Sequence, residues 1–155
     1  MGKLDVKLNK SLVLKQVLIK ELRNIKVEDL DSEIRNFQMK INLLKVQVFG
    51  PLITKSYGTT IHDDGTVTTD YDLMVQAHDY KNYKNHFKIA EKVECVNCAY
   101  IRFQGTSEEI HYAYSKLELF FYENDLMSNG SIFNVFVSNH KDHMVLDVFK
   151  PVVML

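Results

Sequence analysis

The strongest constraint on the fold is a pattern that occurs twice, in which an extended apolar segment leads through an acidic turn into a helical face. Residues 12–27 are rich in Val, Leu and Ile and lack Gly and Pro, which predicts a strand, with a helix as the alternative. Residues 87–105 have the same extended character. Glu33 and Glu109, which follow these segments, are 76 residues apart. We therefore expect the chain to contain a similar half twice.

Each extended segment is expected to lead into a helix. In the first half, Asp29 or Asp31 can cap the helix, because a short carboxylate accepts the free backbone amides at its positive end. In the second half, Thr106 and Glu109 fit a capping box. Apolar residues then recur at helical spacing in both halves. In the first half they are Ile34, Phe37, Ile41, Leu44 and Val48, and Gly50-Pro51 is expected to end the helix. In the second half they are Ile110, Ala113, Tyr114, Leu117, Phe120 and Phe121, in a helix that runs to Leu126.

Two strands follow each predicted helix. Asp64-Gly65 is a strong hairpin signal, since Gly tolerates a positive φ, and it joins residues 52–60 to residues 66–77. The second half continues in the same way with strands at 131–139 and 143–153. Residues 78–86 are polar and rich in turn formers, and they are interpreted as the linker between the halves.

This order of elements predicts an α+β fold. We expect a duplicated βαββ unit that forms one antiparallel sheet, with two helices on one face. At 155 residues the chain is long enough for a single domain, residues 1–155, with half-repeats at 11–78 and 87–153. The sheet face opposite the helices is then free to bind a ligand or partner.

Composition and charge narrow the classes of function. The chain is 46% hydrophobic and 25% charged, as is usual for a soluble globular protein. It has neither a signal-peptide pattern nor an apolar run long enough for a membrane span, so we expect a cytoplasmic protein with no membrane partner. The net charge is −1 and the basic residues are spread along the chain, which makes a nucleic-acid partner a poor expectation.

Asp147 is the first candidate for a binding residue. It lies between Val145 and Phe149 on one face of the last predicted strand, where it is the one acid in an apolar sequence. A carboxylate buried in a pocket attracts a cation, because the charge is poorly screened there. The alternative is that Asp147 is simply paired with a nearby Lys, Tyr hydroxyl or backbone amide.

The other candidates supply aromatic surface or a second acid. Asp72 occupies the matching place in the first half, although its polar strand face favours a solvated residue. The candidate pocket aromatics are Tyr57, Tyr71, Tyr100, Tyr112 and Phe133, since aromatic rings suit flat or cationic ligands, with packing in the core as the alternative for each. Glu118 lies beside the apolar stripe of the second helix, where a charge at the rim is the common role.

Cys95 and Cys98 form a single CxxC sequence, which suits a metal site or a redox pair. His140 and His143 could complete a Cys2His2 set. The sequence around the cysteines is that of a strand, so two buried, unreactive cysteines are the favoured interpretation. No signature of a hydrolase, metalloprotease, P-loop or dinucleotide site is present, and we predict neither a metal nor a cofactor.

Several of these stretches resemble the GyrI-like effector-binding domain of bacterial multidrug-responsive transcription regulators. The resemblance spans residues 11–153 and is carried by AYIRFQGTSEEI at 99–110, the helix Ile110 to Leu126, NGSIF at 129–133 and LDVFKPV at 146–152. The chain departs from the family at Gln104-Gly105-Thr106, where a proline is usual, and has no glycine at the matching turn of the first half. It is also similar to small Gram-positive proteins that are sometimes encoded beside secreted toxins.

The GyrI-like resemblance implies a groove between the halves that binds lipophilic, often cationic, molecules through aromatic side chains and a buried acid. It implies a stand-alone form, because ten residues before the first strand leave no room for a DNA-binding domain. The expected function is thus a small-molecule binding protein, monomeric or homodimeric. One alternative is a protein-interaction or immunity-type partner in a Gram-positive operon. Another is a hydrolase, with Asp147 and Tyr100 as an acid–tyrosine pair, as in some GyrI-like proteins.

Overall fold

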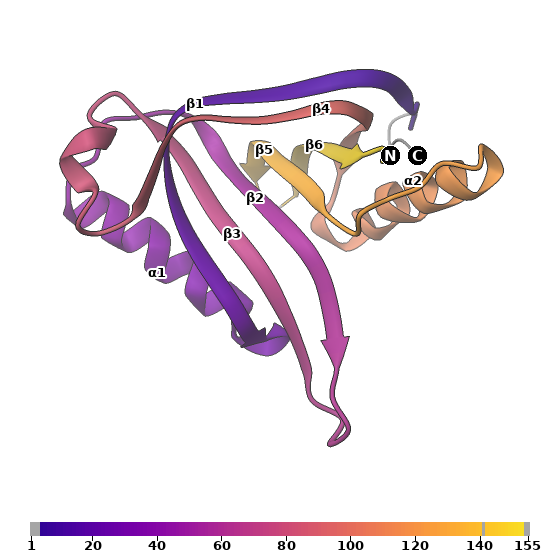
Figure 1. Cartoon of the computed structure of the whole chain (residues 1–155), viewed down its shortest axis with the longest axis horizontal. Coiled ribbons are helices and arrows are strands. Elements are labelled where there is room, and N and C mark those ends of the chain that lie inside the picture. The colour runs from indigo at the N-terminus through magenta and orange to yellow at the C-terminus, as the bar shows by residue number, and fades with distance from the viewer. Residues whose placement is uncertain (1–3, 141, 154–155) are drawn as a thin grey trace. The chain divides into compact units, whose positions relative to one another are not determined.

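The computed structural model describes residues 4–140 and 142–153 (Figure 1). Its elements are, in order, β1 (Lys7–Lys26), the 3-10 helix η1 (Val27–Asp29), α1 (Leu30–Leu43), β2 (Val48–Ile61), β3 (Val67–Ala77), η2 (Tyr80–Tyr83), β4 (Lys88–Gly105), η3 (Ser107–Glu109), α2 (His111–Glu123), β5 (Ile132–His140) and β6 (His143–Pro151). The chain divides into two compact units. The first unit is residues 14–93, and the second unit is residues 4–13 with 94–153. The fold is α+β with antiparallel strands.

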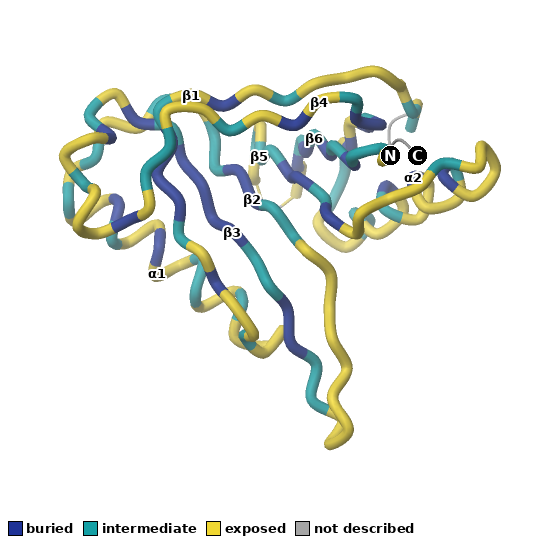
Figure 2. Tube along the Cα trace, in the orientation of Figure 1, coloured by how far each residue is buried: buried dark blue, intermediate teal, exposed yellow. Residues whose placement is uncertain are grey.

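The first unit is built around β3, which pairs with β1 on one side and with β2 on the other. Residues 73–75 and 77 of β3 are all buried, and Figure 2 shows this strand as the longest buried stretch of the unit. Leu73 and Val75 pack with Phe37 and Ile41 of α1, so the helix covers their face of the sheet. Asp72 and Met74, which alternate with Leu73 and Val75 along β3, point to the opposite face of the sheet.

The second unit is built around β6, which pairs with β4 and with β5. Leu146 and Val148 of β6 pack with Ala113, Leu117 and Phe121 of α2 in a separate core. Exposure along β6 alternates strictly between buried and partly exposed residues. Val145, Asp147 and Phe149 therefore share the face opposite α2, as the sequence predicts.

Both helices begin near the predicted sites. The capping box at Thr106 is confirmed, and Glu109 accepts hydrogen bonds from the backbone N–H (3.3 Å) and the hydroxyl (3.0 Å) of Thr106. These bonds, the backbone N–H first, lower the pKa of Glu109 below its ordinary value. No side-chain cap forms at Asp29, because a turn of 3-10 helix precedes α1.

The predicted end of the first helix is wrong. The helix ends at Leu43, and Val48 and Gly50-Pro51 belong to β2. Lys45 takes the left-handed conformation (φ 55°), and the N–H of Val46 donates to the carbonyl of Ile41 (3.2 Å), which together close a Schellman motif. Asp125 closes α2 in the same way (φ 53°), so α2 ends before the predicted Leu126. Neither position carries the glycine that makes such an end recognisable in a sequence.

The hairpin at Asp64-Gly65 is confirmed. Gly65 has φ +86°, and β2 and β3 pair up to Ile61 and Val67 on its two sides. The segment interpreted as a polar linker is partly structured, since it contains η2 and buries Tyr80 in the core of the first unit.

Candidate functional site

Asp147 is held by two neighbours on β4. Arg102 lies directly opposite Asp147 in the β4–β6 register and donates two hydrogen bonds, from Nε to Oδ1 (2.7 Å) and from an Nη to Oδ2 (2.9 Å). Tyr100 donates its hydroxyl to Oδ1 at 2.8 Å. The carboxylate is thus a paired one, and its cation is supplied by the protein. We call these three residues the Asp147 cluster.

Aromatic side chains adjoin the Asp147 cluster. The ring of Tyr100 lies 5.0 Å from that of Phe149, the residue opposite it in the sheet. Phe133 on β5 is opposite Phe149 on the other side and is buried. The face of the second unit opposite α2 therefore combines an aromatic row with one acid–base pair, and three of the predicted residues, Asp147, Tyr100 and Phe133, lie on it.

Asp72 makes a similar cluster in the first unit. Oδ1 accepts a hydrogen bond from Arg23 on β1 (2.9 Å), and Oδ2 accepts one from the hydroxyl of Tyr57 on β2 (2.5 Å). Asp72 is 7% exposed, so the prediction of a solvated residue is wrong. Its strand face is polar, but β3 is flanked by two strands, and Arg23 and Tyr57 reach over the carboxylate. We call these residues the Asp72 cluster.

The pKa values of the tyrosines follow from these contacts. Burial, followed by the hydrogen bond to Asp72, raises the pKa of Tyr57 to about 12. Burial and the hydrogen bond to Asp147 raise the pKa of Tyr100 above its ordinary value. The hydrogen bond to Asp147 raises the pKa of Arg102, so the guanidinium stays charged at any ordinary pH. Both tyrosines are accordingly hydroxyl donors to a carboxylate near neutral pH.

The remaining predicted residues lie elsewhere. Tyr71 is on the opposite face of β3 from Asp72 and packs against the core beneath α1. Tyr112 is 50% exposed on α2, with its ring 4.1 Å from that of His111. Glu118, also on α2, forms an ion pair with the buried Lys150, in keeping with the rim role expected for it. The backbone carbonyl of Tyr71 accepts a hydrogen bond from Arg23 of the Asp72 cluster (3.4 Å), whereas Tyr112 and Glu118 make no hydrogen bond to either cluster among the described residues.

Sequence reasoning missed Arg23 and Arg102. Arg102 lies within the stretch AYIRFQG, two residues after Tyr100, and alternation alone places both side chains on one face of the strand. The strand register, which the sequence does not supply, is what brings Arg102 opposite Asp147. Arg23 lies where the β1–β3 register shifts between Leu22 and Ile25, so no regular alternation could have placed it.

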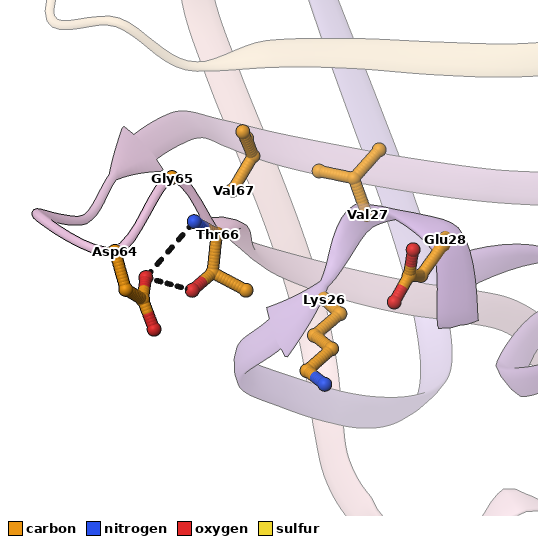
Figure 3. A pocket seen from close by; sticks show the side chains of 7 residues that line it. All are labelled: Lys26, Val27, Glu28, Asp64, Gly65, Thr66 and Val67. Atoms are coloured by element: carbon orange, nitrogen blue, oxygen red, sulfur yellow. Dashed lines mark hydrogen bonds between the residues drawn. The ribbon is translucent and has the colours of Figure 1, made fainter.

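Other features of the described residues offer less chemistry. No group of three or more His, Cys, Asp or Glu side chains among them could hold a metal ion. No helix in this part of the chain is long and apolar enough to span a membrane. A surface pocket lies where the β2–β3 hairpin meets the end of β1, next to the hydrogen bond from the Thr66 N–H to Asp64 (2.9 Å) (Figure 3). Lys26, Val27 and Glu28 complete its lining with Gly65 and Val67, and it contains no predicted site residue.

Solved structures share this fold. The C-terminal domain of EcmrR matches with a TM-score of 0.66 at 10% identity, over 99% of this chain and 98% of that one. SAV2435 bound to tetraphenylphosphonium matches with a TM-score of 0.51 at 9% identity, over 98% and 94%. The chain therefore shares the fold of the EcmrR C-terminal domain and SAV2435, in keeping with the GyrI-like resemblance.

The same fold occurs in a hydrolase from Listeria innocua, with a TM-score of 0.52 at 10% identity, over 97% of this chain and 92% of that one. No family model and no curated protein sequence matches the chain. At these identities the similarity establishes the fold alone, and one fold can accommodate more than one activity. The function is therefore argued from the residues of the site.

Proposed function

We propose that this protein binds a lipophilic small molecule, with an affinity for cationic ones, on the aromatic face that surrounds the Asp147 cluster. The observation that carries the proposal is the placement of the Asp147 carboxylate beside Tyr100 and Phe149, while the side chain of Arg102, which neutralises it, is 46% exposed. Apolar and aromatic rings would contact the body of the ligand, and the carboxylate would attract its positive charge. The neighbour with tetraphenylphosphonium bound supports this ligand class.

Arg102 sets the ligand selectivity in this proposal. Because Arg102 neutralises the charge of Asp147, a neutral lipophile and a lipophilic cation bind with similar strength. A cation gains over a neutral molecule only when it displaces the guanidinium from the carboxylate. The matching cluster at Asp72 would act in the same way on the first unit. The proposal also keeps the duplicated βαββ unit, with half-repeats at 11–78 and 87–153 that form a single antiparallel sheet with two helices on one face.

The test is calorimetric titration of the protein with tetraphenylphosphonium and with a neutral aromatic molecule of similar size. Arg102→Met is expected to tighten binding of the cation about tenfold and to leave binding of the neutral molecule unchanged, because the acid is freed. Asp147→Asn is expected to weaken binding of the cation below that of the neutral molecule, because Arg102 then keeps an unmatched positive charge beside the ligand. Glu123→Gln removes an exposed acid from α2 in the same unit and serves as the control for net charge.

Absence of saturable binding by either molecule would contradict the proposal. Equal affinities of wild type, Arg102→Met and Asp147→Asn for the cation would contradict the role of the cluster while leaving lipophile binding in place. Circular dichroism of each variant establishes that the fold is kept, so that loss of binding is not confused with unfolding.

A hydrolase is the second candidate, favoured by the 2.8 Å hydrogen bond between Tyr100 and Asp147. An acid and a tyrosine within this distance could share a proton during catalysis. The pKa of Tyr100 is raised, however, so its hydroxyl keeps its proton near neutral pH, and Asp147 already accepts two hydrogen bonds from Arg102. Hydrolysis of a chromogenic ester that Tyr100→Phe abolishes would favour this candidate over simple binding.

A further inference from the structure

Cys95 and Cys98 lie much closer together than their positions in a strand would allow. Residues three apart in a regular strand point to opposite faces, with Cα atoms about 10 Å apart. The two sulfur atoms are only 2.7 Å apart, and neither cysteine is in a disulfide. The cause is Asn97, whose left-handed conformation (φ 55°) bends β4 between them. Both side chains are thereby turned into the interior, where Cys98 is 0% and Cys95 is 9% exposed.

The first unit contains the same bend with different side chains. Gln16 on β1 has φ 55°, and the residues two before and one after it, Leu14 and Val17, are buried. Cys95 and Cys98 stand in the same relation to Asn97. Two apolar side chains fill such a bend well, as Leu14 and Val17 do, so packing alone does not call for sulfur in the second unit.

We propose that Cys95 and Cys98 are a redox-active dithiol that closes to an intramolecular disulfide when a low-molecular-weight disulfide is the oxidant. The sulfur atoms need to approach by about 0.7 Å to reach bonding distance. No large rearrangement of β4 is required, because the bend at Asn97 already places both sulfurs on one side.

The reaction proceeds by two thiol–disulfide exchanges. The Cys95 thiolate, the more exposed of the two, attacks one sulfur of the oxidant, which releases a first thiolate and leaves a mixed disulfide on Cys95. The Cys98 thiolate then attacks the Cys95 sulfur and releases the second thiolate. Two electrons pass to the oxidant, and the two protein protons end on its two thiols. Hydrogen bonding with Cys95, and then burial, raise the pKa of Cys98, which suits a thiol that reacts second.

The experiment incubates the native protein with mixtures of oxidised and reduced glutathione. The free thiols are then alkylated in acid-quenched samples, and intact masses are measured without reductant. We expect both thiols to disappear together, with loss of two hydrogens and no bound glutathione. Cys98→Val, which copies Val17, removes the second thiol and is expected to accumulate one glutathione on Cys95. Cys95→Leu, which copies Leu14, is expected to keep a free Cys98, because that sulfur is fully buried.

A comparison that needs no variant keeps the inference testable if either substitution prevents folding. The wild-type protein is oxidised in the same glutathione mixtures, once native and once in denaturant. The native protein is expected to form the disulfide at a lower proportion of oxidised glutathione, because the fold holds the sulfurs together. The proposal would be overturned if the denatured chain forms the disulfide while the native protein either retains two free thiols or accumulates a stable mixed disulfide. Ligand binding plays no part in these readouts, so they are independent of the proposed function.

Discussion

The Asp72 and Asp147 clusters use the same three residue types but assemble them differently. In the second unit, Arg102 and Tyr100 both come from β4, and Arg102 donates two hydrogen bonds to Asp147. In the first unit the partners come from two strands, and Arg23 reaches Asp72 with a single nitrogen while it also donates to Glu21 (3.0 Å). The Asp147 pair is therefore exclusive, whereas the Asp72 pair is part of a small network.

This difference shows what each carboxylate contributes. Among the described residues, removal of Asp147 takes away the carboxylate that pairs with Arg102, whereas Arg23 keeps Glu21 when Asp72 is removed. Hydrogen bonds between charged groups contribute more than neutral ones, and the cost of an unmatched charge depends on what remains beside it. The same substitution at Asp72 and at Asp147 is therefore expected to change stability by different amounts, and three experiments test the difference between the two clusters.

The largest effect is expected from neutralising the acids. Asp147→Asn is expected to lower the free energy of unfolding by about 2 kcal/mol, and Asp72→Asn by about 1 kcal/mol, because only the second leaves the arginine with a carboxylate. Urea denaturation followed by circular dichroism measures both. Equal losses, or a larger loss for Asp72→Asn, would mean that the burial of the acid outweighs the pairing of its arginine.

A smaller effect is expected from exchanging each arginine for lysine. Arg102→Lys is expected to cost about 1 kcal/mol, because an ammonium cannot reproduce the two-point contact with Asp147. Arg23→Lys is expected to cost less than about 0.5 kcal/mol, because a lysine can still meet Asp72 at one point and the side chain is 43% exposed. The same denaturation measurement checks both variants, and similar costs would show that the two-point geometry contributes little.

The smallest effect is the alkaline titration of Tyr57. Its pKa is raised to about 12 in the folded protein from the ordinary tyrosine value of 10.0, so between these values the unfolded chain has lost a proton that the folded one retains. The stability that this proton provides is complete below pH 10 and is lost as the pH rises toward 12. The ultraviolet absorbance of phenolate follows the titration, and Tyr57→Phe is expected to flatten the decline. A decline of unchanged slope in that variant would assign it to other groups.

Local signals in the sequence predicted much of the fold. The period of Ile34, Phe37 and Ile41 located the first helix, and the capping box at Thr106 located the start of the second. The helix ends were missed because Lys45 and Asp125, rather than glycines, adopt the left-handed conformation that stops each helix. A residue other than glycine adopts the left-handed conformation when the surrounding packing compensates for the energetic cost of that conformation. A sequence pattern does not record such compensation.

The candidate site was predicted in part. Asp147, Tyr100 and Phe133 were each predicted as binding residues, and the strand register, which the sequence does not supply, brings them to one face of the second unit. Asp72 was judged from its polar neighbours along the strand, yet it is buried by neighbours across the strands. The roles of all these residues in binding stay predictions until the titrations are done.

By itself the sequence determined the kind and order of the elements, the hairpin at Gly65 and the faces on which the aromatic side chains lie. These properties depend on neighbours within a few residues along the chain. Only the tertiary structure decided that each acid is neutralised by an arginine and that Cys95 meets Cys98. The acid–arginine contacts depend on strand register, which is fixed by packing between segments that are distant in sequence. The contact between the cysteines depends on the unusual backbone conformation of Asn97, which interrupts the regular alternation of β4.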